Sequence, residues 1–232
     1  MIVGVPGADE VVAAGYLGVR PRPRPEWVDV RYVRDPLLSL AGDLVATGPT
    51  VTWVGSADEE LAALGVASDQ LGDARAWIDD LERRAGILHP NVCRTPDDVA
   101  DFSDRFVPEG LAVLGVALPA DQVDAFLVEH EAYDQQDGIV ILLREARPLA
   151  PGHQSLGYEP VSVDYRGLGC SWTCNGLQGA VAEATGIVPN EWGFIDTEKE
   201  AETVMAFLAD PAVGKEPGIW RAWLVARYDA AA

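Results

Sequence analysis

The chain has few basic residues. Its 232 residues include 17 Lys and Arg against 37 Asp and Glu, which gives a net charge of −20. A protein that binds nucleic acid through the phosphates needs a dense field of Lys and Arg. The shortage of basic side chains therefore excludes a general nucleic-acid binder, and we expect no nucleic-acid partner.

The chain also lacks a long apolar run and has only three cysteines, Cys93, Cys170 and Cys174. A membrane-spanning helix needs about 20 predominantly apolar residues, and a secretory signal starts with a basic region that is not seen here. An odd number of cysteines does not indicate a disulfide framework. We therefore expect a cytoplasmic protein with no membrane partner. Because 48% of the residues are hydrophobic, the chain is not disordered.

Short apolar segments are interspersed with segments of helical periodicity. Strands are predicted at residues 28–33, 51–54, 111–118, 139–143, 158–163 and 219–228, and helices at 71–85, 123–127 and 201–208. Because the two kinds of element do not alternate strictly, we predict an α+β fold with a mixed, largely antiparallel sheet flanked by helices. The chain divides into an N-terminal α/β region, 1–106, and a C-terminal α+β domain, 107–232; in the alternative, both pack as one domain.

Two helix starts are marked by capping residues. Thr95 is followed by Pro96 and two aspartates, and Thr197 with Glu200 forms a capping box. The predicted last strand, 219–228, carries large apolar side chains at both odd and even positions, so both of its faces are expected to be covered. Its Arg221 and Arg227 would then need carboxylate partners.

The negative charge is concentrated in one part of the chain. Residues 58–145, which we call the acidic block, hold 20 acidic and 6 basic side chains, a net charge of −14. Before it, residues 20–25 alternate Arg and Pro, which predicts an extended connector with a basic face. Such a segment is a solvated linker, or it docks on the chain's own acidic surface or on a partner.

The densest group of unusual residues is at 167–176. Cys170, Cys174, Leu177 and Val181 recur at helical spacing, which predicts a helix that begins near Ser171 with both sulfurs on its core side.

Two interpretations of these cysteines stay open. Cys170 and Cys174 are buried structural residues, or one of them is a catalytic nucleophile activated at a helix N-terminus, with His153 as a further candidate catalytic residue. Trp172 and Asn175 fall on the opposite face of the predicted helix and are candidates for recognition of a partner.

Metal sites have little support, because the three His and three Cys lack the paired spacing of a zinc site. The carboxylates at the predicted start of the helix after Thr95 could gather a hard cation, although such residues commonly favour the helix dipole alone. These are Asp97, Asp98, Asp101 and Asp104. We expect no metal and no cofactor, and we take the four aspartates as candidate binding residues.

The order of landmarks in the C-terminal half resembles an uncharacterised bacterial family similar to the immunity proteins of polymorphic toxin systems. The resemblance rests on Leu156-Gly157-Tyr158-Glu159, Ser171-Trp172-Thr173-Cys174-Asn175, residues 186–195 with Pro189 and Asn190, and Glu216-Pro217-Gly218 with Trp220 and Trp223. Where relatives place His before Ser-Trp, this chain has Cys170. The resemblance implies a binding protein inside the cell and supplies no catalytic residues.

The leading hypothesis is therefore an antidote-like protein that binds a basic protein partner such as a toxin domain. An acidic surface speeds encounter with such a partner, and Trp172, Trp192 and Trp53 are side chains of the kind that anchor interfaces. The alternatives are a cysteine-dependent enzyme that uses Cys170 or Cys174, and an acidic mimic of DNA. Solubility or adaptation to salt would also account for the acidity. The sequence does not indicate an oligomeric state.

Overall fold

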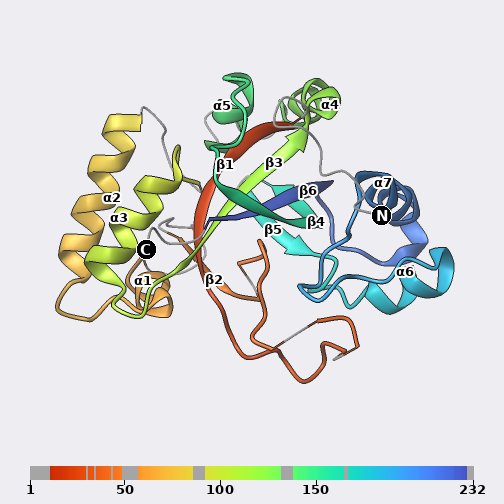
Figure 1. Ribbon diagram of the computed structural model, residues 1–232, viewed down its shortest axis with the longest axis horizontal. Coiled ribbons are helices and arrows are strands. Elements are labelled where there is room, and N and C mark those ends of the chain that lie inside the picture. Colours follow the sequence, from red (N-terminus) through yellow and green to blue (C-terminus); the bar gives the residue numbers. More distant parts are fainter. Residues whose placement is uncertain are drawn as a thin grey trace.

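A computed structural model describes residues 11–29, 31–33, 35–42, 44–48, 57–85, 92–131, 138–164 and 167–228. These residues form a curved sheet with helices on both faces (Figure 1). The strands are β1 (Val11–Arg20), β2 (Ala46–Gly48), β3 (Ala112–Pro119), β4 (His153–Asp164), β5 (Gly167–Ser171) and β6 (Ile219–Tyr228). They pair in the order β2-β1-β3-β6-β4-β5, and every pair is antiparallel. The predicted α+β class with an antiparallel sheet is confirmed. The predicted strand at 51–54 and Trp53 lie outside the described residues.

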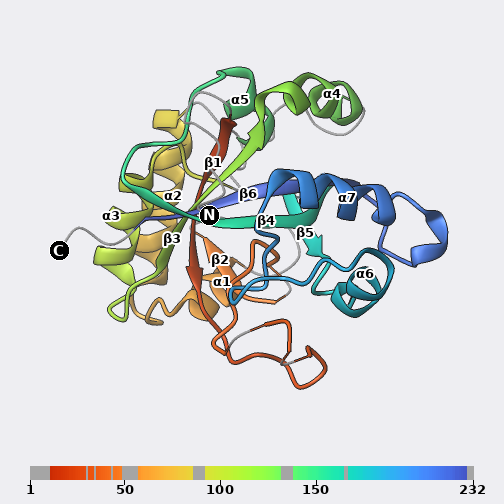
Figure 2. The same cartoon turned by 45° about the vertical axis from the view of Figure 1, so that its right-hand side comes forward.

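The helices fall into three groups in space (Figures 1 and 2). Helices α1 (Ala57–Leu64), α2 (Leu71–Ala85) and α3 (Pro96–Phe106) lie together at one end, and α6 (Gln178–Thr185) and α7 (Glu198–Leu208) lie at the other. Helix α4 (Ala120–His130) follows β3 in the chain, and helix α5 (Gly138–Arg144) comes next. Both lie apart from the other two groups. A short 3-10 helix, Pro211–Val213, follows α7. Within the described ranges, no helix is both long and apolar enough to cross a membrane.

Strand β6 is central, as its sequence predicts. It pairs with β3 on one side and with β4 on the other. Trp220 and Leu224 on one face pack into the core beneath α1–α3, α6 and α7. Trp223 and Val225 on the opposite face pack into a second core beneath α4, α5 and residues 37–41 and 44–45. One six-stranded sheet thus has a separate apolar core on each face.

The sheet bends where two strands carry a β-bulge at a glycine. The pairing of β1 with β3 shifts between Ala13 and Gly15, and that of β4 with β6 shifts between Ser155 and Gly157. Gly15 and Gly157 have φ values of 136° and 123°, a region that side chains other than glycine rarely adopt. A bulge increases local twist and bends the strand, so these glycines help to curl the sheet around its two cores.

Both predicted helix starts are confirmed. The hydroxyl of Thr95 accepts a hydrogen bond from the backbone N–H of Asp98 at 3.2 Å, and that of Thr197 accepts one from Glu200 at 3.3 Å. The Thr197 hydroxyl also donates to the Glu200 carboxylate at 2.9 Å, so the two side chains predicted to form a capping box are in contact.

Two predicted strands are wrong. Residues 139–143 lie in helix α5, where Ile139, Leu142 and Leu143 form one buried helical face against β1. A short apolar run does not distinguish a strand from a buried helix, and here the helix is formed. The described part of 28–33 forms turns instead, because the Asp29 carboxylate accepts the backbone N–H of Arg31.

The extended character predicted for residues 20–25 is consistent with the structure. Arg20 ends strand β1, and Arg22 makes an isolated antiparallel bridge with Leu37. Arg20 also forms an ion pair with Glu109, so this basic segment docks in part on the chain's own acidic residues.

Candidate functional site

The helix predicted through the cysteine cluster is not formed. Cys170 lies in strand β5, Cys174 lies in the turns that follow, and helix α6 begins only at Gln178. Gly167 and Gly169 belong to strand β5, and turns follow it. The four-residue spacing of the two cysteines therefore does not reflect a helix. Both side chains are half-buried, and neither lies at a helix N-terminus.

The thiol of Cys170 faces a carboxylate. Its Sγ donates to Glu216 Oε2 at 3.1 Å. His153 is the first residue of β4, whereas Cys170 precedes Ser171, which pairs with Val161 further along the same strand. The eight residues from His153 to Val161 span about 25 Å of strand. His153 instead places Nδ1 2.9 Å from the carbonyl of Ala150. The structure therefore does not bring Cys170 and His153 together as a catalytic pair.

The residues near the cysteines that were candidates for recognition have internal roles. Trp172 is fully buried, so its side chain is not presented to a partner. The amide of Asn175 donates to the Ser171 carbonyl at 3.0 Å and accepts the backbone N–H of Glu216 at 3.1 Å, which joins two loops. Trp192 is half-buried, and its ring lies 6.0 Å from the guanidinium of Arg227. Arg227 thus has an aromatic neighbour in addition to any carboxylate.

The four aspartates of α3 divide into two pairs. Asp97 and Asp104 are exposed. Asp98 accepts the Thr95 hydroxyl at 2.7 Å, and Asp101 accepts the indole N–H of Trp77 at 2.9 Å and a guanidinium N–H of Arg105 at 2.8 Å. Across the residues that the structure describes, no group of three or more His, Cys, Asp or Glu is arranged to hold a metal ion.

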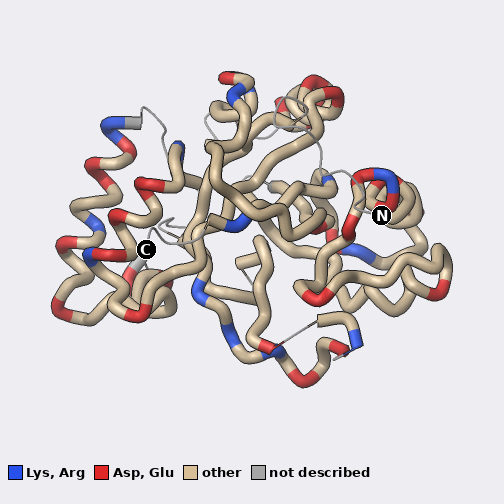
Figure 3. Tube along the Cα trace, viewed as in Figure 1, with Lys and Arg blue, Asp and Glu red and all other residues tan. Residues whose placement is uncertain are grey.

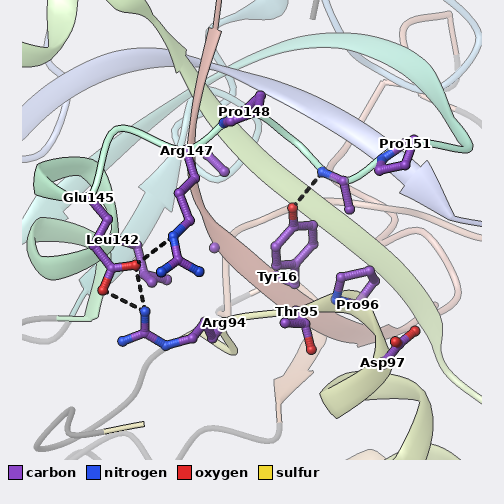
Figure 4. Close-up of a pocket in the computed structure, with 13 residues that line it drawn as sticks. Tyr16, Arg94, Thr95, Pro96, Asp97, Leu142, Glu145, Arg147, Pro148 and Pro151 are labelled. Atoms are coloured by element: carbon purple, nitrogen blue, oxygen red, sulfur yellow. Dashed lines mark hydrogen bonds and ion pairs between the residues drawn. The ribbon is translucent and has the colours of Figure 1, made fainter.

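One pocket, of about 420 Å³, opens between β1, the start of α3 and the end of α5 (Figure 4). We call it the α3–α5 pocket. Its charged wall is an ion-pair network in which Glu145 holds both Arg94 and Arg147. The Tyr16 hydroxyl accepts the backbone N–H of Ala150 at 2.8 Å on the other side. The network joins the segment before α3 to the segment after α5, and its charged groups are engaged with one another.

A second pocket, of about 390 Å³, opens between helices α4 and α7. We call it the α4–α7 pocket. Its apolar lining includes Ala125, Tyr158, Ala201, Met205, Trp220 and Ala222. Carboxylates also line it, from Asp121 on α4 and from Glu198 and Glu202 on α7. An apolar pocket with a few polar groups converging on it is the usual form of a binding site.

The one cation among the lining residues of the α4–α7 pocket is held by its neighbours. Arg221 on β6 pairs with Glu129 at 3.0 Å and donates to the Trp220 carbonyl at 2.8 Å. Its guanidinium also lies 5.8 Å from the ring centre of Phe126. The carboxylate partner expected for Arg221 is therefore found. Since Glu129 balances Arg221, the pocket has an excess of negative charge.

The sequence gives no sign of the α4–α7 pocket, because its lining comes from four separate segments. In the sequence, Asp121 and Glu202 have the pattern of solvent-exposed residues on amphipathic helices. Only the alternation of 219–228, which places Trp220 and Ala222 on the same strand face, could have marked the pocket floor.

A buried carboxyl group on β4 is a further feature that the sequence does not show. Glu159 is 1% exposed, and its carboxylate accepts hydrogen bonds from the Ser39 hydroxyl at 2.6 Å and the Leu40 backbone N–H at 2.7 Å. Burial raises the pKa of Glu159 to about 7, although hydrogen bonds from Ser39, Leu40 and Ser171 oppose the rise. The group joins residues 39–41 to the sheet and does not line either of the two pockets.

Comparisons with protein-family models, with curated proteins and with solved structures find no match to this chain.

Proposed function

We propose that the protein binds a basic protein partner and neutralises it, in the manner of an immunity protein that inhibits a toxin domain. The observation that supports this proposal is that the few basic residues of the acidic block form ion pairs within the block. Five of its six arginines pair with carboxylates of the same block. The net negative charge of the acidic block therefore comes from the carboxylates that outnumber its arginines.

Three of these ion pairs lie within a single helix and leave the acidic surface in place. Arg83 and Arg84 both bind Asp80 on their own helix, at 3.1 and 2.9 Å. Arg105 binds Asp101 one turn away, at 2.8 Å. Exposed aspartates that face solvent on the same helices include Asp73, Asp79, Asp97 and Asp104. Figure 3 shows acidic positions along α2 and α3 and again on α4 and α7.

Such a surface favours one class of partner. A field of one sign steers a protein of opposite charge into contact and raises its association rate, and it repels nucleic acid. An acidic protein can thereby compete with nucleic acid for the basic surface of a nuclease-like toxin. The resemblance of the C-terminal half to immunity proteins agrees with this role.

The two alternatives have less support. Cys170 and His153 lie on distant parts of β5 and β4, so this pair does not favour a cysteine-dependent enzyme. The acidic positions of the block are divided between α1–α3 and α4, which lie apart in both views (Figures 1 and 2). That division does not favour the single row of charges that mimicry of DNA requires.

The test uses the gene beside this one. If that gene encodes a protein with a basic toxin-like domain, we expect the two proteins to form a stoichiometric complex and co-expression to restore growth. By calorimetry, the dissociation constant should rise about tenfold or more between 50 and 300 mM salt, since charge attraction is screened. A neighbourhood without a toxin-like gene, together with no capture of a basic protein at low salt, would leave solubility or salt adaptation as the reason for the acidity.

A further inference from the structure

The α4–α7 pocket exists because strand β6 runs beyond its neighbour. The last pair between β3 and β6 is Ala117 with Leu224, and β3 ends at Pro119. The first residues of β6, from Ile219 onward, lie beyond this last pair and are paired with β4. Helix α4 leaves directly from the end of β3, while α7 packs on β4 and β6. The space between these two helices is floored by the part of β6 that β3 does not reach.

The floor of this pocket is apolar and contains two aromatic side chains. Trp220 and Ala222 come from β6, and Tyr158 comes from β4. The Trp220 indole N–H donates to the Glu216 carbonyl at 2.9 Å, which fixes the orientation of its ring. Met205 lines the same pocket, and its thioether adapts readily to the shape of a neighbour.

The carboxylates of the pocket come from two helices. Asp121 and Glu202 are exposed, and Glu198 is half-buried in the first turn of α7. The charge of Arg221 is compensated by Glu129, and the Arg221 side chain is only 16% exposed. A guest that enters between α4 and α7 therefore meets negative charge together with an apolar floor.

We propose that the α4–α7 pocket receives a Lys or Arg side chain that the basic protein partner presents. The aliphatic stem of such a residue packs on Trp220 and Met205, and its cationic head lies near the carboxylates of Asp121 and Glu202. A volume of about 390 Å³ suits one or two side chains. This inference rests on the proposed function and names the part of the partner that enters this site.

The experiment uses capped tripeptides as probes. Ala-Lys-Ala, Ala-Arg-Ala and, as the neutral control, Ala-Gln-Ala are titrated into the isotopically labelled full-length chain and followed by amide NMR. We expect saturable shifts on α4, α7 and β6 with the Lys and Arg peptides, with dissociation constants on the order of millimolar. Equal shifts with the Gln peptide, or no saturable shift at these elements, would overturn the inference.

Two variants separate this site from general attraction to an acidic surface. Asp121→Asn with Glu202→Gln should weaken binding of the Lys peptide about fivefold, as expected for the loss of two exposed charge contacts. Glu183→Gln on α6 removes an exposed carboxylate outside the pocket and serves as the matched control, with a change below about twofold. An equal effect of both changes would overturn the inference.

The same variants distinguish the two proposals. If the neighbouring toxin-like protein binds the Asp121→Asn, Glu202→Gln variant as tightly as it binds the unaltered chain, this inference is wrong while the proposed function stands. If it binds neither form, the proposed function is wrong. The peptide titration then still decides whether the pocket accepts a basic side chain.

Discussion

The carboxylate of Glu159 accepts the backbone N–H of Leu40 at 2.7 Å, across 119 positions of the chain. The Ser39 hydroxyl donates to the other oxygen of the same group at 2.6 Å. Neither group is exposed to water, so this contact secures residues 39–41 over the second core of the sheet. A fully buried carboxyl group that holds its proton to about pH 7 makes this attachment sensitive to pH.

We expect stability to fall as the pH rises from about 4.5 to 7. The folded protein keeps a proton on Glu159 up to about pH 7, whereas the unfolded chain releases it near 4.5. The folded state therefore binds more protons in this range, and its contribution of about 3 kcal/mol is present in full below the range and lost across it. Urea unfolding at several pH values measures this slope.

Glu159→Gln is the comparison for that measurement, because a glutamine keeps the shape and can hydrogen bond to Leu40 and Ser39 without titrating. We expect the free energy of unfolding of this variant to vary less between pH 4.5 and 7 than that of the unaltered chain. Glu183→Gln, at an exposed position, should leave the slope unchanged. Parallel curves for Glu159→Gln and the unaltered chain would contradict this account.

A second prediction concerns the bulge in β4. An added Cβ at Gly157 would lie 2.5 Å from the Ile195 carbonyl oxygen, and its φ of 123° strains any other residue. Tyr158 and Ile195 exchange two backbone hydrogen bonds beside it, so the loop cannot withdraw without breaking them. We expect Gly157→Ala to cost about 2 kcal/mol or more in chemical unfolding.

Gly72 on α2 supplies the control, since no atom lies within 4 Å of an added Cβ there. Gly72→Ala should leave stability unchanged or raise it by up to about 1 kcal/mol, because alanine favours a helix. Similar costs for Gly157→Ala and Gly72→Ala would show that the bulge does not require glycine.

The parts of the fold that the sequence predicts are those with a local signal. Strand β6 follows from its own alternation, and the starts of α3 and α7 follow from Thr95 and Thr197. Strand β1 has no such signal, because Val11–Arg20 is apolar at almost every position and contains two glycines. It is recognised as a strand only by its pairing with β2 and β3, which come from distant parts of the chain.

The helix predicted through the cysteines is not formed and the α4–α7 pocket was not predicted, for the same reason. The helical spacing of Cys170 and Cys174 is broken by turns that the spacing does not reveal. The α4–α7 pocket depends on the register between β3 and β6. This register places Trp220 on the part of β6 that lies past the end of β3 at Pro119. Register is a property of the whole sheet, so a reading of single segments cannot supply it.

A third prediction concerns the thiols. Cys93 is fully buried, and burial raises the pKa of its thiol well above the usual range. Its backbone also pairs with Tyr16, which keeps it in the core beside β1. We expect iodoacetamide to spare Cys93 in the folded protein and to label it after unfolding. Mass spectrometry of the alkylated peptides measures this.

Cys170 and Cys174 are half-buried and serve as the internal comparison. We expect them to be labelled more than Cys93 in the folded protein. Rapid labelling of Cys170 at neutral pH, faster than that of a small thiol, would contradict a structural role for its contact with Glu216. It would revive the alternative of a cysteine-dependent enzyme.

The last prediction compares two tryptophans that are equally buried. Trp172 and Trp223 are both 0% exposed. The indole N–H of Trp223 donates to the Val161 carbonyl at 3.3 Å, whereas that of Trp172 has no hydrogen-bond partner among the described residues. Replacing either with Phe leaves a cavity of similar size, but only Trp223→Phe also loses a hydrogen bond. We expect Trp223→Phe to cost about 1 kcal/mol more than Trp172→Phe in urea unfolding, and an equal or smaller cost would contradict this assignment.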